Sequence, residues 1–163
     1  MGKGNDPNCV TAKSDMQIVP EGELRVWLDD DLEDRAPGGT WIQVTTAQEA
    51  IHMLETGRVV ELSLDHDLGD DQLYGRGVDV VDFLAQQQFL NQRPLWPRDG
   101  ITLHTANPEG RDAMARSIHR YAAMAGPVTR LLTRGGKPRF TFGQAEQPAK
   151  SDDQENADHQ TRQ

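Results

Sequence analysis

The chain has 163 residues, which is enough for one domain with a sizeable core, and its net charge is −9. Such an acidic chain is poorly suited to bind duplex DNA, because that binding relies on Lys and Arg to neutralise phosphates. Its single cysteine rules out a disulfide within the chain, and no apolar run approaches membrane-spanning length or forms a signal-peptide core. We therefore expect a soluble, cytoplasmic protein that does not contact a membrane.

Both ends of the chain have the composition of disordered segments. Hydrophobic residues make up 36% of the whole chain, a low share for a globular protein. Residues 1–21 and 144–163 contribute to this deficit, since they are rich in polar residues and glycine and hold few large apolar side chains. Such segments cannot bury enough surface to offset the entropy lost on ordering. The sequence predicts disordered tails at 1–21 and 144–163, and one α/β domain at 22–143.

Apolar runs alternate along the chain with segments of helical periodicity. The predicted strands, in chain order, are 24–28, 41–44, 59–64, 101–106, 128–133 and 139–142. The predicted helices are about 46–57, 78–90 and 107–125, and Thr46 and Glu49 have the spacing of a capping box at the start of the first. Gly135 and Gly136 favour a hairpin between the last two strands. This alternation is typical of a three-layer α/β fold with a mainly parallel sheet.

Two of the predicted strands end in carboxylates. Asp29 and Asp30 follow the first strand, and Asp65 and Asp67 follow the third. The carboxyl ends of neighbouring parallel strands meet at one edge of a sheet, so these side chains are expected to lie together. Carboxylates in one small space repel each other unless a cation binds, and hard oxygen ligands suit Mg²⁺, Mn²⁺ or Ca²⁺. The pattern favours a metal site over the alternative, which is a set of solvated loop charges.

Two histidines occupy matching positions near strand ends. They are His66, after the third strand, and His104, near the end of the fourth. Either side chain could act as a general acid or base, or donate a hydrogen bond to a phosphate oxygen. The alternative for each is a half-buried histidine that is hydrogen-bonded to a backbone carbonyl.

The segment after the fourth predicted strand has the features of an anion site. Thr105 places a hydroxyl at the strand end, and Asn107 and Pro108 suit the start of a helix. The free N–H groups and the dipole of a helix N-terminus attract anions. Arg111 is unfavourable for that dipole, and a bidentate phosphate contact would explain its position. A surface salt bridge is the alternative.

Three motifs, in this order, resemble a known family. They are Leu-Asp-Asp with the following Arg35 and Pro37, then Leu-Ser-Leu-Asp-His-Asp-Leu-Gly, then His-Thr-Ala-Asn-Pro-Glu-Gly-Arg. Together they are similar to the motifs of the cyclic-phosphate processing receiver domain family, over about residues 24–122. That family is a divergent branch of the two-component receiver fold, and it usually has His-Ser where this chain has His104 and Thr105.

The resemblance implies a flavodoxin-like and receiver-like sheet of order 2-1-3-4-5, with its site at the carboxyl ends of strands 1, 3 and 4. Asp29 and Asp30 would be the metal-binding pair, and Asp65 would be the phospho-accepting aspartate. Thr105 would be the switch hydroxyl. The family has four further site positions beyond those of an ordinary receiver, and in this chain they are His66, Asp67, His104 and Asn107. It is proposed to act on 2′,3′-cyclic phosphate ends in nucleic-acid repair.

The chain departs from an ordinary receiver in two places. Residues 31–40 look like a loop, where a receiver has a helix after its first strand. A receiver also has a lysine at the end of its fifth strand, and this chain offers Arg130 or Arg134 near that point. The missing lysine puts the usual phosphorylation switch in question and favours catalysis over signalling.

The sequence therefore predicts a phosphoesterase that uses Mg²⁺ or Mn²⁺ and acts on a 2′,3′-cyclic phosphate, either in a nucleotide or at an RNA end. The expected catalytic residues are Asp65, His66, His104 and Thr105. The expected phosphate-binding residues are Thr105, Asn107 and Arg111, and the expected metal ligands are Asp29, Asp30, Asp65 and Asp67. Whether Asp65 is a metal ligand or a nucleophile stays open. Two alternatives are a non-enzymatic receiver phosphorylated on Asp65 and a haloacid-dehalogenase-like phosphatase that uses Asp29 and Asp31.

Overall fold

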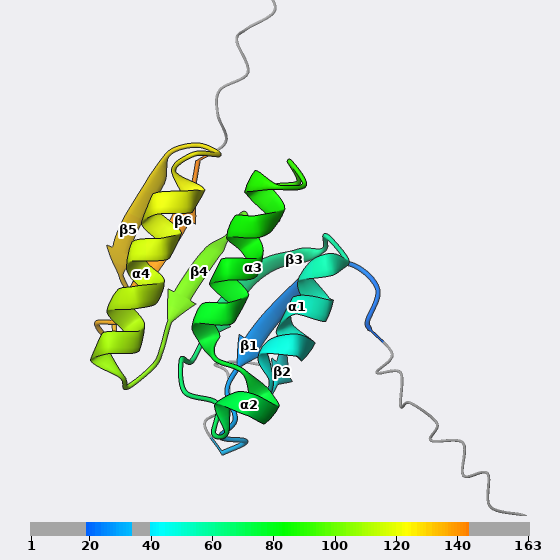
Figure 1. The fold of residues 1–163 in the computed structure, drawn as a ribbon, viewed down its shortest axis with the longest axis vertical. Helices are drawn as coiled ribbons and strands as arrows, with labels where there is room; N and C mark the ends of the chain where they lie inside the picture. The colour runs from blue at the N-terminus through cyan, green and yellow to red at the C-terminus, as the bar shows by residue number, and fades with distance from the viewer. Residues whose placement is uncertain (1–18, 34–39, 144–163) are drawn as a thin grey trace, which may run out of the picture.

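The computed structural model describes residues 19–33 and 40–143, which form one sheet with helices packed against it (Figure 1). The strands are β1 (Leu24–Leu28), β2 (Trp41–Val44), β3 (Val59–Leu64), β4 (Gly100–Leu103), β5 (Val128–Leu132) and β6 (Pro138–Phe142). The helices in these ranges are α1 (Ala47–Glu55), α2 (Asp71–Tyr74), α3 (Gly77–Phe89) and α4 (Pro108–Ala122). The predicted tails lie outside the described residues, apart from 19–21. None of the described helices is long and apolar enough to cross a membrane.

The strand order is β2-β1-β3-β4-β6-β5. The first four strands of this order are parallel, and β6 runs antiparallel to both of its neighbours. The α/β class, the mainly parallel sheet, the receiver-like order of the parallel strands and the final hairpin are thus confirmed. The difference is that β6, not β5, lies beside β4. Its Phe140 pairs with Ile101 and is 1% exposed, so burial of this ring places the returning strand inside the sheet.

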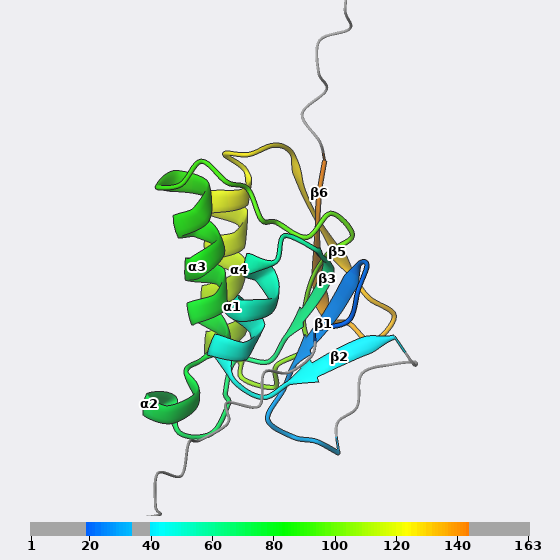
Figure 2. The ribbon, with the colours of Figure 1, turned by 90° about the vertical axis from the view of Figure 1, so that its right-hand side faces the viewer.

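The helices lie on one face of the sheet. Figure 2 shows the sheet nearly edge-on, with α1, α3 and α4 side by side along that face. The structure therefore differs from the expected three layers, since the described residues form two. The described helices all lie in the connections between β2 and β5, and a helical layer on the second face would need helices in the β1–β2 connection or after β5. The β1–β2 connection has no helix in its described parts, and after β5 the chain turns back as β6.

The core lies between the sheet and the three longer helices. Every residue of β3 is buried, as expected for the central strand. The predicted capping box starts α1: Glu49 N–H donates to Thr46 Oγ1 (3.1 Å), and Thr46 N–H donates to Glu49 Oε2 (3.2 Å). At the start of α4, Gly110 N–H donates to Asn107 Oδ1 (3.0 Å). These hydrogen bonds cap the first turns of α1 and α4 and so determine where the two helices begin.

The opposite face of the sheet carries an ion-pair network around one buried glutamate. Side chains alternate across a strand, so Arg25 and Glu61 point away from the helices while their neighbours enter the core. Glu61 is 7% exposed and contacts two cations, Arg25 (3.3 Å) and Arg139 (2.7 Å). Because β1, β3 and β6 each supply one member, these charges hold the register on the face that lacks helices.

The loop after β3 lies tightly against the N-terminal ends of α3 and α4. Gly77 N–H donates to the carbonyl oxygen of His66 (2.9 Å), and a Cβ on Gly77 would overlap with the carbonyl oxygen of Asp65. A Cβ on Gly110 would overlap with the ring of His66. Glycine at these two positions lets the segment that carries Asp65 and His66 pass close to both helices.

We expect Gly77→Ala and Gly110→Ala to lower the free energy of unfolding by about 1–3 kcal/mol each, the usual cost of overpacking. The added methyl groups would push against Asp65 and His66, and urea denaturation would measure the loss. Gly135→Ala is the matched control, because its Cβ would meet only the Thr133 hydroxyl at 4.0 Å. Equal stability of all three variants and the parent would contradict this account of the loop.

Candidate metal centre

Three parallel strands end side by side and carry the site on their carboxyl tips. The hydrogen-bond pattern continues one residue past each strand: Asp29 N–H donates to Val44 O (3.0 Å), and Asp65 N–H donates to Leu28 O (2.9 Å). In the same way, the His104 N–H donates to the carbonyl oxygen at the end of β3. The backbone at each tip is therefore fixed by its neighbour, and the side chains start from defined positions.

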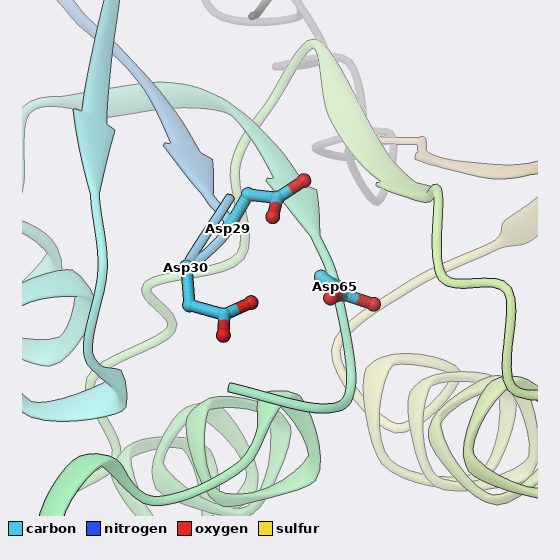
Figure 3. Close-up of side chains that lie close together, drawn as sticks. All are labelled: Asp29, Asp30 and Asp65. Carbon is cyan, nitrogen blue, oxygen red and sulfur yellow. The ribbon is translucent and has the colours of Figure 1, made fainter. Parts of the chain in front are cut away.

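Asp29, Asp30 and Asp65 gather at one point of this edge (Figure 3). Each offers one carboxylate oxygen, and these oxygens all lie within 4.8 Å of one another. Asp29 is buried, Asp65 is half-buried and Asp30 is exposed. Three carboxylates at this spacing repel one another, and an oxygen-rich donor set of this kind fits a hard divalent cation. The residues present could therefore hold a divalent cation.

The three carboxylates are held to different degrees. Asp29 Oδ1 accepts from the Asp31 N–H (2.9 Å), and Asp29 Oδ2 faces the Nε2 of His104 (3.1 Å). Asp65 Oδ1 accepts from the N–H of His66 (2.7 Å). Asp30 makes no hydrogen bond or ion pair within the described residues. Its carboxylate thus has no structural partner in these ranges and is available to a ligand.

The side chain of His104 is almost completely buried, and the residue is part of the lining of the cavity that holds the carboxylates. Its Nδ1 lies 2.8 Å from the Ser63 hydroxyl, its Nε2 faces Asp29, and its side chain is 1% exposed. The ring also stacks on Trp27, with 4.0 Å between ring centroids. The Ser63 hydroxyl can donate to Nδ1, which leaves the Nε2–H for Asp29. This geometry suits His104 to hold Asp29 in place, and its role as a general acid or base stays a prediction.

A second chain of hydrogen bonds joins His66, Asp67 and Asn107. His66 Nδ1 lies 2.7 Å from Asp67 Oδ1, and the Asn107 amide donates to Asp67 Oδ2 (2.9 Å). The hydrogen bond with His66, and then the one from Asn107, hold the pKa of Asp67 below its usual value. Asp67 is therefore ionised at neutral pH. It lies outside the cluster of three carboxylates, but it lines the same cavity of about 290 Å³.

The remaining predicted residues divide between the cavity and its surroundings. Thr105 and Asn107 line the cavity, and the Thr105 hydroxyl accepts from the Asn107 N–H (3.2 Å). Asn107 also caps α4, so both ends of its side chain are engaged by the protein. Arg111 is half-buried in the first turn of α4 and is not among the residues that line the cavity.

Two residues near this site were assigned no role from the sequence. Ser63 lies within β3 and within the second of the three motifs, but its partner His104 is 41 positions away and the sequence does not show that the two side chains meet. Lys137 precedes β6, and its ammonium group lies 6.0 Å from the centroid of the Trp27 ring, which stacks on His104. The hairpin could have indicated Lys137, because it returns the chain to β4 at the edge where the carboxylates lie.

A family model described as the cyclic-phosphate processing receiver domain matches residues 24–120. The chain belongs to this family. The match begins with β1 and ends within α4, so it includes all three strand tips of the candidate site. No curated protein and no solved structure matched the chain. The resemblance seen in the sequence is thereby confirmed, and the protein is a receiver domain of the cyclic-phosphate processing type.

We expect Ser63→Ala to weaken Mn²⁺ binding by about 10-fold, the lower end of the usual cost of losing a residue that orients a metal ligand. Without the hydroxyl, His104 loses its partner at Nδ1 and holds Asp29 less firmly. Titration followed by the EPR signal of free Mn²⁺ would measure the change. Thr102→Ala removes a hydroxyl from the position paired with Ser63 and serves as the control. Unchanged affinity in Ser63→Ala would refute the positioning role.

Proposed function

We propose that this receiver domain is a phosphoesterase that uses a divalent cation to open a 2′,3′-cyclic phosphate, in a nucleotide or at an RNA end. The observation that carries the proposal is the cluster of Asp29, Asp30 and Asp65 within one small cavity. Membership of the cyclic-phosphate processing family supports the substrate class. The three carboxylates lie at the carboxyl ends of parallel strands, which is also where open α/β sheets bind their ligands.

Asp29, Asp30 and Asp65 would hold the cation. Bound there, Mg²⁺ or Mn²⁺ would supply Lewis-acid chemistry to a phosphoryl oxygen. His104 keeps Asp29 in place and Ser63 keeps His104 in place, so the ligand set is preorganised on its buried side. Asp30, which is exposed and lines the cavity, would complete the ligand set on the side that solvent reaches.

The other residues that line the cavity bind the substrate and the attacking water. The Thr105 hydroxyl accepts from a backbone N–H and keeps its own proton free to donate to a phosphoryl oxygen. The ionised Asp67 accepts a hydrogen bond from the water, and His66 and Asn107 fix its orientation. The N-terminal end of α4 adds a positive partial charge beside the phosphate.

In the proposed reaction, the oxygen of water forms a bond to phosphorus and one of the two phosphorus–ribose oxygen bonds breaks. The proton lost by the water ends on the ribose oxygen that leaves. The product is a phosphomonoester next to a free hydroxyl, and no oxidant or further reactant is needed. An aspartyl-phosphate on Asp65 is the other route to the same product, and it stays open because Asp65 lines the cavity with one oxygen not engaged by the backbone.

A second candidate function is that of a receiver phosphorylated on Asp65. The position of Lys137 favours it, since its ammonium group stands over Trp27 at the edge of the sheet where the carboxylates lie. The haloacid-dehalogenase-like reading is less favoured. It needs Asp29 as a nucleophile, whereas both oxygens of this buried carboxylate are held by Asp31 and His104.

We expect the full chain with Mg²⁺ or Mn²⁺ to hydrolyse a 2′,3′-cyclic mononucleotide, and EDTA to stop the reaction. Asp65→Asn should lower kcat/KM by at least about 100-fold, because even indirect changes at metal sites cost 10–100-fold. Asp70→Asn is the isosteric control, since Asn can still cap α2 and the residue lies outside the cluster. No turnover, together with a stable acyl phosphate formed from a small phosphodonor, would favour the receiver function instead.

A further inference from the structure

Positive charge gathers in the last third of the folded domain. Residues 107–143 hold seven Lys and Arg against two Asp and Glu, whereas residues 1–106 hold eight against nineteen. The net charge of −9 is therefore distributed unevenly along the chain, with a basic segment at 107–143 and an acidic excess before it. The separation is also spatial, because α4, β5 and β6 form one side of the molecule in Figure 1. An anionic ligand is attracted to this side and repelled by the rest.

A groove of about 900 Å³ lies between α4 and the outer strands. Arg116, His119 and Arg120 line it from α4, and Arg130 lines it from β5. Phe140 of β6 is also part of the lining. Three guanidinium groups therefore face a space large enough for several residues of an extended ligand.

These arginines have no acidic partners within the described ranges. Arg116, Arg120 and Arg130 are all exposed, and none of them is part of an ion pair with a described residue. In contrast, Arg25 and Arg139 are paired with the buried Glu61. Among the described residues, Asp112 is the one acidic residue in the lining of the groove. Surface arginines left unpaired beside one another are unfavourable for folding, and they suit recognition of phosphates.

The groove also offers an aromatic surface. Tyr121 is part of its lining, and the guanidinium carbon of Arg120 lies 5.4 Å from the centroid of that ring. Basic grooves with aromatic side chains are the usual means of binding single-stranded nucleic acid without sequence preference, because the cations follow the backbone and the bases stack. A duplex is a poorer fit to a protein whose remaining surface is acidic.

The helix links the groove to the candidate metal centre. It starts at Asn107, which lines the cavity with the carboxylates, and it carries Arg116 and Arg120 away from that edge alongside β5 (Figure 1). With a rise of 1.5 Å per residue, these two arginines lie about 14 and 20 Å along the axis from Asn107. A strand of nucleic acid that follows the groove can therefore reach the site with its end.

We propose that the groove between α4 and β5 binds the backbone of single-stranded RNA whose 3′ end occupies the site of the three carboxylates. The inference rests on the proposed function. A 2′,3′-cyclic phosphate needs a ribose 2′-hydroxyl and closes a 3′ end, so the rest of the strand must leave the site in the 5′ direction. The groove gives this 5′ part of the strand its binding surface, and the preferred substrate is an RNA end rather than a free nucleotide.

The test compares two substrates in the triple variant Arg116→Gln, Arg120→Gln, Arg130→Gln. One substrate is a 2′,3′-cyclic mononucleotide, and the other is an oligoribonucleotide of about eight residues that ends in a cyclic phosphate. We expect KM for the oligomer to rise by on the order of tenfold, with the mononucleotide unaffected. Arg134→Gln, an exposed arginine outside the groove lining, controls for the change in net charge. Equal effects on both substrates would overturn the proposal.

A binding measurement separates this inference from the proposed function. Fluorescence anisotropy of the labelled oligomer, with Asp65→Asn as the background, needs no turnover. Loss of three phosphate contacts should make the plot of log K against log salt shallower by about 2, since each contact contributes about 0.7 with single strands. If neither substrate is hydrolysed but the salt dependence of binding becomes shallower in the triple variant, the proposed function is wrong and the proposal that the groove binds RNA is supported. Unchanged binding in the triple variant, or equally tight binding of a duplex, would refute the groove.

Discussion

The mutual repulsion of three carboxylates is the constraint on which the rest of this structure depends. Asp29 and Asp65 end adjacent strands of a parallel sheet, so the ladder that stabilises the sheet also forces their side chains together. Asp29 is 4% exposed, and a carboxylate buried to that degree is costly unless it is hydrogen-bonded. The Asp31 N–H and His104 supply those bonds. A divalent cation bound among the three carboxylates would neutralise the negative charge of the cluster as a whole.

The surroundings of the cluster are closely packed. The loop after β3 lies between two helix N-termini, where Gly77 and Gly110 leave no room for a side chain. On the face of the sheet without helices, Trp27 and His104 stack, and Glu61 binds an arginine from each side. The site thus has one firmly held carboxylate, Asp29, and one exposed carboxylate, Asp30, that makes no hydrogen bond within the described residues. A preorganised inner side and an accessible outer side are what metal-assisted chemistry on a phosphate requires.

The sequence predicted those parts of the fold and site that depend on neighbouring residues. Asp29, Asp30 and Asp65 were found because each directly follows an apolar strand, and the capping box at Thr46 and Glu49 marked the start of α1. The position of β6 could not be predicted, because it depends on burial of Phe140 against Ile101, 39 residues away along the chain. Two expected helical layers became one, since periodicity shows that a helix forms but not which face of the sheet it covers.

The roles of single side chains were harder to predict than their presence at the site. His104 was identified as a site residue, but its burial between Ser63 and Asp29 follows from contacts across three strands. Asp67 was grouped with the other carboxylates, and its hydrogen bonds to His66 and Asn107 place it outside the cluster. Lys137 was missed because its proximity to Trp27 arises only when the hairpin folds back beside β4. Strand tips can be recognised from sequence, whereas contacts between tips need the structure.

The central claim is that Asp29, Asp30 and Asp65 hold one divalent cation, and calorimetric titration of Mn²⁺ tests it most directly. The informative variant is Asp30→Asn, because this exposed carboxylate makes no hydrogen bond within the described residues and its loss should leave the thermal stability of the metal-free protein unchanged. The account predicts one Mn²⁺ per chain in the parent and a clear loss of affinity in the variant. A parent that binds no cation, or a variant that binds as tightly as the parent, would contradict it.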